Sequence, residues 1–250
     1  STRPIQTRPS PQPVKERIVP PASTPRELKE RMNPQPSLER AVYAQKSDKG
    51  NDIDYSKRSL HNGTTEDRIS AASLRDGKTF YVKMGEAKLK IVDMNNIKNG
   101  FEYRDPNNTG SVLVEIQASD LEKNLTPHFK VKELAIIPGR YSPNLTVHKV
   151  GGKVYHAYMR IDPGLVNGLE FVRQEAGVPI TITSGYRPPS YNDGVDGAKR
   201  SMHMSGLAVD VSSPNLKKLD EPAKKVFNGV GYGKTFRHFD KRQIKASWTY

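Results

Sequence analysis

The sequence contains no cysteine, and this absence excludes several kinds of chemistry at once. Disulfide bonds, thiolate zinc sites and cysteine nucleophiles are ruled out, so any metal must be held by histidine and carboxylate side chains. No run of about 18 apolar residues is present, so no membrane-spanning helix is expected. The first residues lack the apolar segment of a signal peptide, so none is predicted.

Hydrophobic and acidic residues are also scarce. Only 34% of the 250 residues are hydrophobic, against a typical ~45–50% that also counts glycine, so we expect a core over part of the chain only. Forty Lys and Arg residues outnumber 27 Asp and Glu residues, which gives a net charge of +13. This excess favours a polyanionic partner such as a cell wall, an acidic protein surface or nucleic acid. Nucleic acid is not expected, because the basic residues do not form one stripe with aromatic residues.

Proline is concentrated in the first part of the chain. Residues 1–36 contain nine of the 19 prolines, a composition typical of an extended, polyproline-like arm. Within it, the capping-box pattern of residues 24–27 predicts one short helix over 25–32. We expect this arm to dock on neighbouring subunits of a larger assembly. Residues 37–77 are predicted to form short helices and a linker, with helices over 38–46 and 65–77.

Residues 78–119 change to a pattern typical of strands. The segments 79–83, 89–92 and 111–116 are rich in β-branched and aromatic residues, and polar turn residues separate them. They predict a small antiparallel β module that carries no chemical motif and acts in docking or as a spacer.

Residues 120–250 are predicted to form a compact α+β domain. Asp162 and Pro163 open a helix that Gly177 ends. Strands are predicted over 179–183 and 207–211, and a last strand over 236–240. Between them, we expect a short helix with Pro222 in its first turn and a flexible turn over 229–233.

Three residues of this domain have the chemistry of a metal site. His203 lies in a predicted turn, and a bend at Gly206 can bring Asp210, on the following strand, into the same cleft. His238, on the last predicted strand, can supply a third ligand. Two imidazoles and one carboxylate bind zinc with a fourth position open for water. Taken alone, a histidine near an aspartate is more often a structural hydrogen-bonded pair than part of a metal site.

A wider pattern surrounds these residues. In chain order it comprises Leu125-Thr126-Pro127-His128-Phe129, Ser184-Gly185-Tyr186-Arg187, Tyr191-Asn192, Ser201-Met202-His203, Gly206-Leu207-Ala208-Val209-Asp210 and His238-Phe239-Asp240. Over residues 120–242, about half of the chain, this pattern resembles the zinc D-alanyl-D-alanine carboxypeptidase family of peptidoglycan peptidases, which includes phage members.

The resemblance implies a role for each matching residue. His203, Asp210 and His238 match the zinc ligands. Arg187 matches an arginine that binds substrate and steadies the reacting carbonyl, and a guanidinium suits both tasks. The implied fold is α+β: a compact zinc-peptidase-like domain with a small antiparallel sheet, preceded by the β-rich module and the proline-rich arm.

Two further residues are candidates by position. Ser201 lies two residues before a ligand and is expected to line the substrate cleft. Asp240 is two residues past His238 on a strand, so it is expected on the same face, where it can orient a ligand or handle protons.

The sequence departs from the family at one place. These enzymes often carry an acidic residue or a histidine two or three positions before the last ligand, where this chain has Thr235 and Phe236. Neither side chain can act as a general base at neutral pH. Three alternatives follow: Asp240 acts as the general base, another group acts as the general base, or activity is reduced or lost.

Two functions therefore remain open. The first is a zinc peptidase that cleaves peptide stems or cross-links of peptidoglycan, carried in a phage virion as a tail or head–tail junction component and acting in the host wall or periplasm. The second is a structural virion protein that retains the peptidase fold without turnover.

Overall fold

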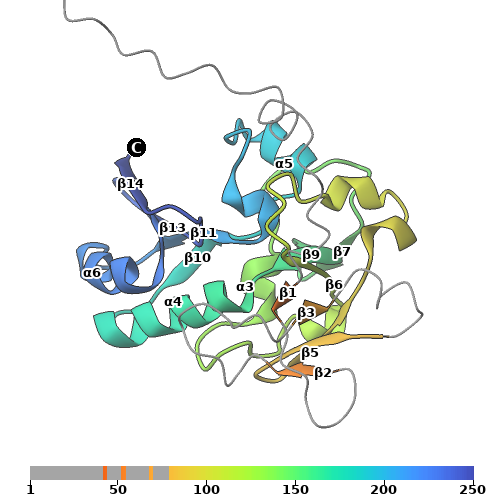
Figure 1. Cartoon of the computed structure of the whole chain (residues 1–250), viewed down its shortest axis with the longest axis horizontal. Coiled ribbons are helices and arrows are strands. Elements are labelled where there is room, and N and C mark those ends of the chain that lie inside the picture. The colour runs from red at the N-terminus through yellow and green to blue at the C-terminus, as the bar shows by residue number, and fades with distance from the viewer. Residues whose placement is uncertain (1–41, 44–51, 55–67, 70–78) are drawn as a thin grey trace, which may run out of the picture. The chain divides into compact units, whose positions relative to one another are not determined.

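A computed structural model of this protein describes residues 42–43, 52–54, 68–69 and 79–250 (Figure 1). The predicted arm over 1–36, and most of the predicted helices over 37–77, lie outside these residues. All described residues belong to one unit of the chain. No helix among them has both the length and the apolar character needed to span a bilayer.

Two predicted helices differ from the structure at the residues that it describes. Strand β1 (Val42–Tyr43) lies within the segment predicted helical over 38–46, and β3 (Arg68–Ile69) lies within 65–77. The two strands pair antiparallel. β-Branched and aromatic residues favour extended pairing when a partner strand is present, and that partner is 25 residues away in sequence, beyond the reach of a local pattern.

The first five-stranded sheet extends beyond the predicted β module. Its order is β2-β4-β5-β6-β9, and all its pairs are antiparallel except the parallel pair β2–β4. The three predicted strands of the module are present as β4, β5 and β6. The bounds are β2 Asp52–Asp54, β4 Tyr81–Met84, β5 Ala87–Ile91, β6 Val112–Glu115 and β9 Tyr158–Ile161. Because β9 comes from the predicted peptidase domain, one sheet joins the two regions.

Short elements lie along the chain between the strands of the first sheet. The hairpin β7–β8 and several short helices precede the long helix α4. Their bounds are η1 Met94–Asn96, η2 Gly100–Tyr103, η3 Ala118–Asp120, α3 Val131–Ala135, β7 Val147–Val150 and β8 Lys153–His156.

Helix α4 (Pro163–Ala176) confirms the prediction from its capping residues. The Asp162 side chain accepts a hydrogen bond from the backbone N–H of Leu165, and Gly177 ends the helix at φ +61°. Its buried face packs on α6 (Lys217–Val226), where the structure differs from the prediction. Pro222 lies inside α6 and not in its first turn, because an amphipathic turn with buried Leu219 extends the helix toward its N-terminus.

The second five-stranded sheet has the order β10-β11-β13-β12-β14. Its pairs are antiparallel except for the parallel pair β12–β14. The bounds are β10 Thr181–Ser184, β11 Ala208–Ser212, β12 Gly229–Tyr232, β13 Arg237–Asp240 and β14 Ala246–Thr249. Two predictions are corrected here: 229–233 is largely a strand and not a flexible turn, and β14 follows the strand that was expected to be last.

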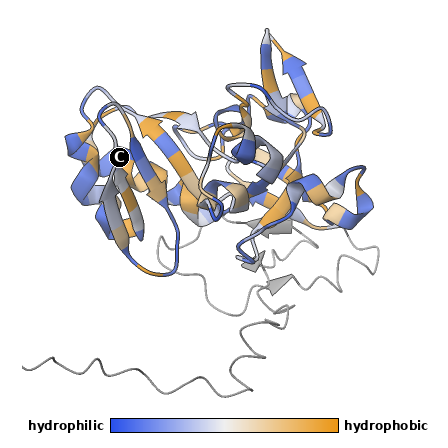
Figure 2. Cartoon of the chain, turned by 90° about the horizontal axis from the view of Figure 1, so that it is seen from above, coloured by the Kyte–Doolittle hydropathy of each residue, from blue (hydrophilic) through white to orange (hydrophobic). Residues whose placement is uncertain are grey.

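One face of this second sheet belongs to the core. Phe227, at the end of α6, stacks on Phe239 of β13 with ring centroids 5.2 Å apart, and Gly168 of α4 lies against Phe227. Val209 and Val230 lie beside Phe239 in the register and are buried with it. Figure 2 shows how hydrophobic and hydrophilic residues alternate along the strands. The alternation leaves the opposite face free for polar residues. The fold class is therefore α+β, as predicted.

The core also contains a histidine that makes folding sensitive to acid. His156 of β8 is fully buried and its Nε2 lies 3.2 Å from the carbonyl oxygen of Tyr186, while Nδ1 has no hydrogen-bond partner among the described residues. Burial lowers the pKa of His156 from 6.5 to about 4. The unfolded chain therefore binds this proton more readily than the folded one.

We expect the free energy of unfolding to fall as the pH drops from about 6.5 to about 4, by about 3 kcal/mol from this group. The neutral side chain of His156→Gln can still donate to Tyr186 but cannot gain a proton. Urea unfolding at several pH values measures the free energy of unfolding of the natural chain and of the variant. A variant curve as steep in pH as that of the natural protein would contradict the assignment.

Candidate metal centre

The register of the second sheet gathers polar residues into one row across its open face. Asp210 of β11 pairs with His238 of β13, and Ser184 of β10 pairs with Asp210 on its other side. On the far side of His238 the row continues through Gly231 of β12 to Trp248 of β14. Side chains of paired residues point to the same face of a sheet, so this row forms the floor of the site.

His203 reaches the same place from a turn beside the sheet. It lies in the short helix η4 (Met202–Ser205), which Ser201 caps at its start. Gly206 ends η4 in the left-handed region, at φ +67°, and a Cβ atom there would lie 2.3 Å from the backbone oxygen of Arg160. The expected bend at Gly206 is therefore present, and it leads the chain directly into β11.

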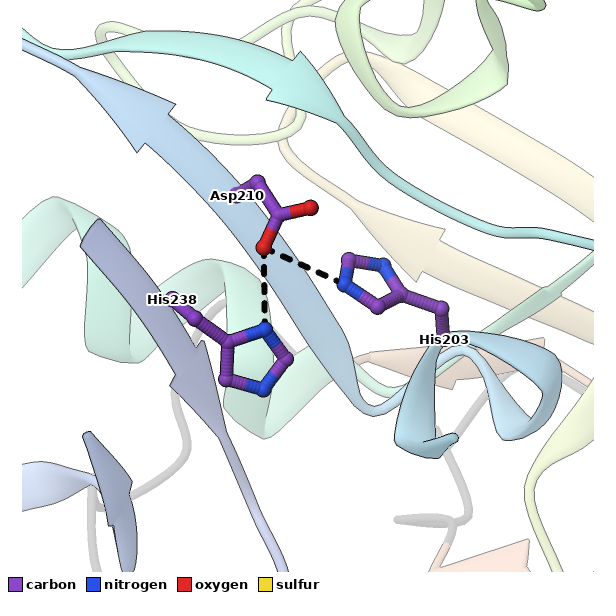
Figure 3. A group of neighbouring side chains, drawn as sticks. All are labelled: His203, Asp210 and His238. Atoms are coloured by element: carbon purple, nitrogen blue, oxygen red, sulfur yellow. Dashed lines mark hydrogen bonds and ion pairs between the residues drawn. The ribbon is translucent and has the colours of Figure 1, made fainter. Parts of the chain in front are cut away.

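The structure brings together the three residues singled out as metal ligands (Figure 3). One ligand atom from each of His203, Asp210 and His238 lies within 4.8 Å of the other two. Oδ1 of Asp210 is 3.3 Å from Nε2 of His203 and 2.9 Å from Nδ1 of His238. Zinc bonds of about 2.0–2.2 Å at tetrahedral angles place ligand atoms about 3.3 Å apart, so the spacing fits this ion.

Both histidines are held in the tautomer that a metal needs. Nδ1 of His203 lies 2.7 Å from the backbone oxygen of Gly185, an acceptor only, so Nδ1 carries the proton and Nε2 keeps its lone pair. Nε2 of His238 lies 2.9 Å from Oδ2 of Asp240, which leaves Nδ1 to face Asp210. Acceptors on the outer nitrogen atoms are the arrangement that orients metal-binding histidines.

The ionisation of the site follows from burial and close pairing. Burial opposes the charged form of Asp210, but pairing with the rings of His203 and His238 outweighs burial and holds the pKa of Asp210 far below its usual range. In the absence of a metal, a ring donates to this carboxylate when it is protonated on the nitrogen that faces it. Burial lowers the pKa of His203. Burial also acts on His238, where the hydrogen bonds with Asp210 and Asp240 prevail and raise its pKa. A proton on His238 therefore competes with a metal, and metal affinity is expected to fall in acid.

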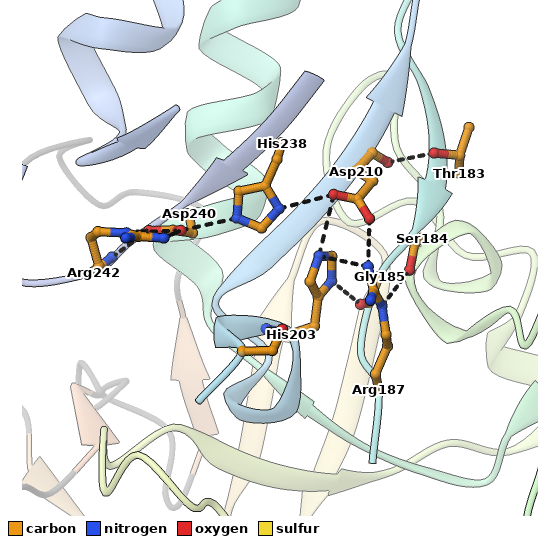
Figure 4. Close-up of polar contacts among 10 residues, drawn as sticks. Thr183, Ser184, Gly185, Arg187, His203, Asp210, His238, Asp240 and Arg242 are labelled. Carbon is orange, nitrogen blue, oxygen red and sulfur yellow. Dashed lines mark hydrogen bonds and ion pairs between the residues drawn. The ribbon is translucent and has the colours of Figure 1, made fainter. Parts of the chain in front are cut away.

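Arg187 lies against two of the three candidate ligands (Figure 4). Its Nη2 is 2.5 Å from Oδ2 of Asp210 and 3.0 Å from Nε2 of His203, and its Nε donates to Oγ of Ser184. Its side chain is 16% exposed, so the guanidinium borders the site without being sealed from solvent. The arginine singled out from the sequence is thus beside the candidate metal centre.

Asp240 lies behind His238 and is fully buried. Both of its oxygens accept hydrogen bonds from the side chain of Arg242, at 2.6–3.0 Å. Burial opposes its charge, but bonds with His238 and Arg242 lower the pKa of Asp240 to about 2. Gly229 makes room for this carboxylate, because a Cβ atom there would lie 2.2 Å from Oδ1 of Asp240. The carboxylate is therefore charged and held toward His238.

Sequence reasoning missed two residues of the site. Arg242 holds Asp240, and its guanidinium carbon lies 4.5 Å from the ring centroid of Trp248. The ring of Trp248 lies 5.3 Å from that of His238. The alternation of small and aromatic residues over 246–250 is a strand signal that could have placed Trp248 in the sheet.

Ser201 and the residues before His238 have structural contacts. Oγ of Ser201 accepts a hydrogen bond from the backbone N–H of His203 at 3.4 Å and so caps η4. Phe236 packs on Tyr250, with ring centroids 4.9 Å apart. In the family that the sequence resembles, an acidic residue often stands at this position. Here Phe236 stands there instead and makes an aromatic packing contact.

The comparison with known families agrees with this geometry. Residues 127–240 match the family model described as Peptidase M15. This segment contains Arg187, all three candidate ligands and Asp240, and its match supports a metallopeptidase of this family. No curated protein matches the chain.

Proposed function

We propose that this Peptidase M15 segment makes the chain a zinc-dependent peptidase that cleaves peptide stems or cross-links of bacterial peptidoglycan. One observation carries the proposal: a nitrogen of His203, a nitrogen of His238 and an oxygen of Asp210 converge, with each histidine held in the tautomer for metal binding. The outer acceptors leave the inner nitrogen of each ring able to bind a metal.

Each residue of the site has a distinct task. His203, Asp210 and His238 would hold the zinc ion. When bound, zinc lowers the pKa of a water molecule and polarises a carbonyl group, which is the chemistry of peptide hydrolysis. Arg187 forms an ion pair with Asp210 and can donate to a substrate carboxylate or to the developing oxyanion, since it borders solvent beside the ligands.

Asp240 acts as a positioning residue. It is fully buried and in contact with His238 and Arg242, so it does not reach substrate directly. Its carboxylate keeps a proton on Nε2 of His238 and thereby keeps Nδ1 directed at Asp210. Proton transfer to the leaving amine then belongs to a group that borders the cleft.

The proposal also includes a location. We place the chain in a bacteriophage particle, as a tail or head–tail junction component that acts on the host wall or in the periplasm. The nine prolines of residues 1–36 support an arm that docks on other virion subunits, and the net charge of +13 suits an anionic wall. Detection of the chain in purified phage particles tests this part.

A second function is favoured by the residues before His238. Phe236 occupies a position where related enzymes have a proton-transferring group, and its ring packs on Tyr250. A chain without turnover would be a structural virion protein that retains the peptidase fold. Zinc would then only stabilise it.

One experiment separates the two functions. The full chain is incubated with purified peptidoglycan of several chemotypes, and the release of free amino groups and the zinc content are measured. Hydrolysis that a chelator abolishes and added zinc restores supports the peptidase. Bound zinc without hydrolysis of any chemotype supports the structural protein.

A further inference from the structure

A loop of the first sheet reaches the turn that carries His203. The loop spans residues 105–109, between η2 and β6, and it lies outside the segment that matches the peptidase family. The loop and η4 are about 100 residues apart in sequence, yet side chains of Asp105 and Asn107 bond directly to η4. These contacts connect the upstream sheet to the metal centre.

Asp105 bonds to the end of the turn. Its Oδ1 accepts a hydrogen bond of 2.6 Å from Oγ of Ser205, which is fully buried. The same oxygen accepts from the backbone N–H of Asn107, and Oδ2 accepts from the backbone N–H and the hydroxyl of Thr109. Four donors therefore fix this carboxylate, so that it holds Ser205 in one position.

Asn107 bonds to both ends of the turn. Its Nδ2 donates to the backbone oxygen of Ser201 at 3.1 Å and to Oγ of Ser205 at 3.0 Å. Ser201 and Ser205 are the residues two before and two after His203. A single amide group thus bridges the turn on the side that faces the loop.

The ends of the loop are themselves anchored. Arg160 of β9 donates from Nε to the backbone oxygen of Tyr103 and from Nη1 to that of Ser111, both at 2.7 Å. The backbone of Arg160 also lies against Gly206, where a side chain would clash. The turn with His203 is therefore held between the loop and β9, and its position depends on the first sheet.

We propose that Asp105 and Asn107 are positioning residues for His203, and that the upstream sheet is consequently part of the metal centre. The inference rests on the proposed function, since it assumes that His203 binds zinc. Groups bonded directly to a metal ligand typically contribute 10–100-fold to metal affinity. Asp105 and Asn107 act through the residues that flank His203, so we expect zinc affinity to fall by about 10-fold, the lower end of that range, in Asp105→Ala and in Asn107→Ala.

The test is a zinc competition titration of the full chain with a chromophoric chelator, performed well below the melting temperature. Asp105→Asn keeps an acceptor oxygen for Ser205 and should recover part of the affinity. Asp93→Ala is the matched control: Asp93 caps η1 in the same region through Asn95, without contact to η4. It should leave zinc affinity unchanged even if the melting temperature falls.

The outcomes distinguish this inference from the function on which it rests. Tight zinc binding by the natural chain together with unchanged affinity in both loop variants would overturn the positioning role alone. Absence of zinc binding by the natural chain would overturn the metal centre and the positioning role together. If Asp105→Ala does not fold, Asn107→Ala, which removes one amide from a partly buried loop, decides the result.

Discussion

Replacement of His203 by alanine is expected to remove bound zinc and to lower peptidoglycan hydrolysis by about 10³-fold or more. The variant loses one of three ligands, and a bound metal contributes several kcal/mol to the stabilisation of the reaction's charge. The lost ring also leaves the carbonyl oxygen of Gly185 without its hydrogen bond from Nδ1. Elemental analysis and the release of amino groups measure the two effects.

His148→Ala is the control for this substitution. His148 lies on the β7–β8 hairpin, and its Nε2 bonds to the backbone oxygen of Ile116 and not to the candidate centre. The control should retain zinc and activity. Hydrolysis by His203→Ala at the rate of the natural chain would mean that catalysis does not use this centre.

Asp240→Asn is expected to lower zinc affinity and activity about 10–100-fold without a change of ligand. The amide has no charge to hold the proton on Nε2 of His238, and its NH₂ group opposes Arg242, whose guanidinium accepts no hydrogen bond. The pKa of His238 should fall as well, because the Asp240 carboxylate contributes to raising it. Zinc titration over a range of pH, together with kcat and KM, gives the measurement.

Asp220→Asn is the matched control, because the partner of Asp220 lies on the strand that carries Asp240 and points to the opposite face. Asp220 of α6 pairs with Arg237, the residue before His238, at 2.7 Å between Oδ1 and Nε. This substitution also weakens a partly buried Asp–Arg pair, but it makes no change to the face of the sheet that carries Asp210 and His238. Equal losses of zinc affinity in both variants would assign the effect to general destabilisation and not to the orientation of His238.

One face of the second sheet packs in the core, and the other face carries the candidate centre. Val209, Phe239 and Val230 face the helices, and Asp210, His238 and Gly231 face the candidate centre. Because side chains alternate along a strand, the rigid packing of one face fixes the positions of the ligands on the other. Chemistry that needs tight geometry is thus placed on an element whose register the core determines.

The first sheet has a larger part than its sequence indicates. A spacer or docking module was predicted over 78–119, because these residues contain no motif of their own. In the structure β6 pairs with β9, and the loop before β6 bonds to the turn that carries His203. A segment without catalytic residues can thus still contact the turn that carries a candidate ligand.

Local sequence patterns were enough to predict several elements. Helix α4 follows from the capping residues Asp162 and Gly177 with apolar residues at helical spacing. Three of the five strands of the first sheet, β4, β5 and β6, follow from their β-branched and aromatic residues. The cysteine-free composition left histidine and carboxylate as ligands, and the motifs around His203 and Asp210 singled out the candidate centre. Each of these signals lies within a few neighbouring residues.

Only the tertiary structure decided which distant residues support the centre. The contacts of Asp240 with Arg242, of Trp248 with His238, and of Asp105 with Ser205 depend on strand register and on loop placement. Contacts of this kind produce no periodic pattern in the sequence, because many other pairs of residues could equally have been brought into contact by the fold. The sequence alone therefore determined the types of ligand and the local elements, and long-range packing determined the tautomers, the charges and the positions of those ligands.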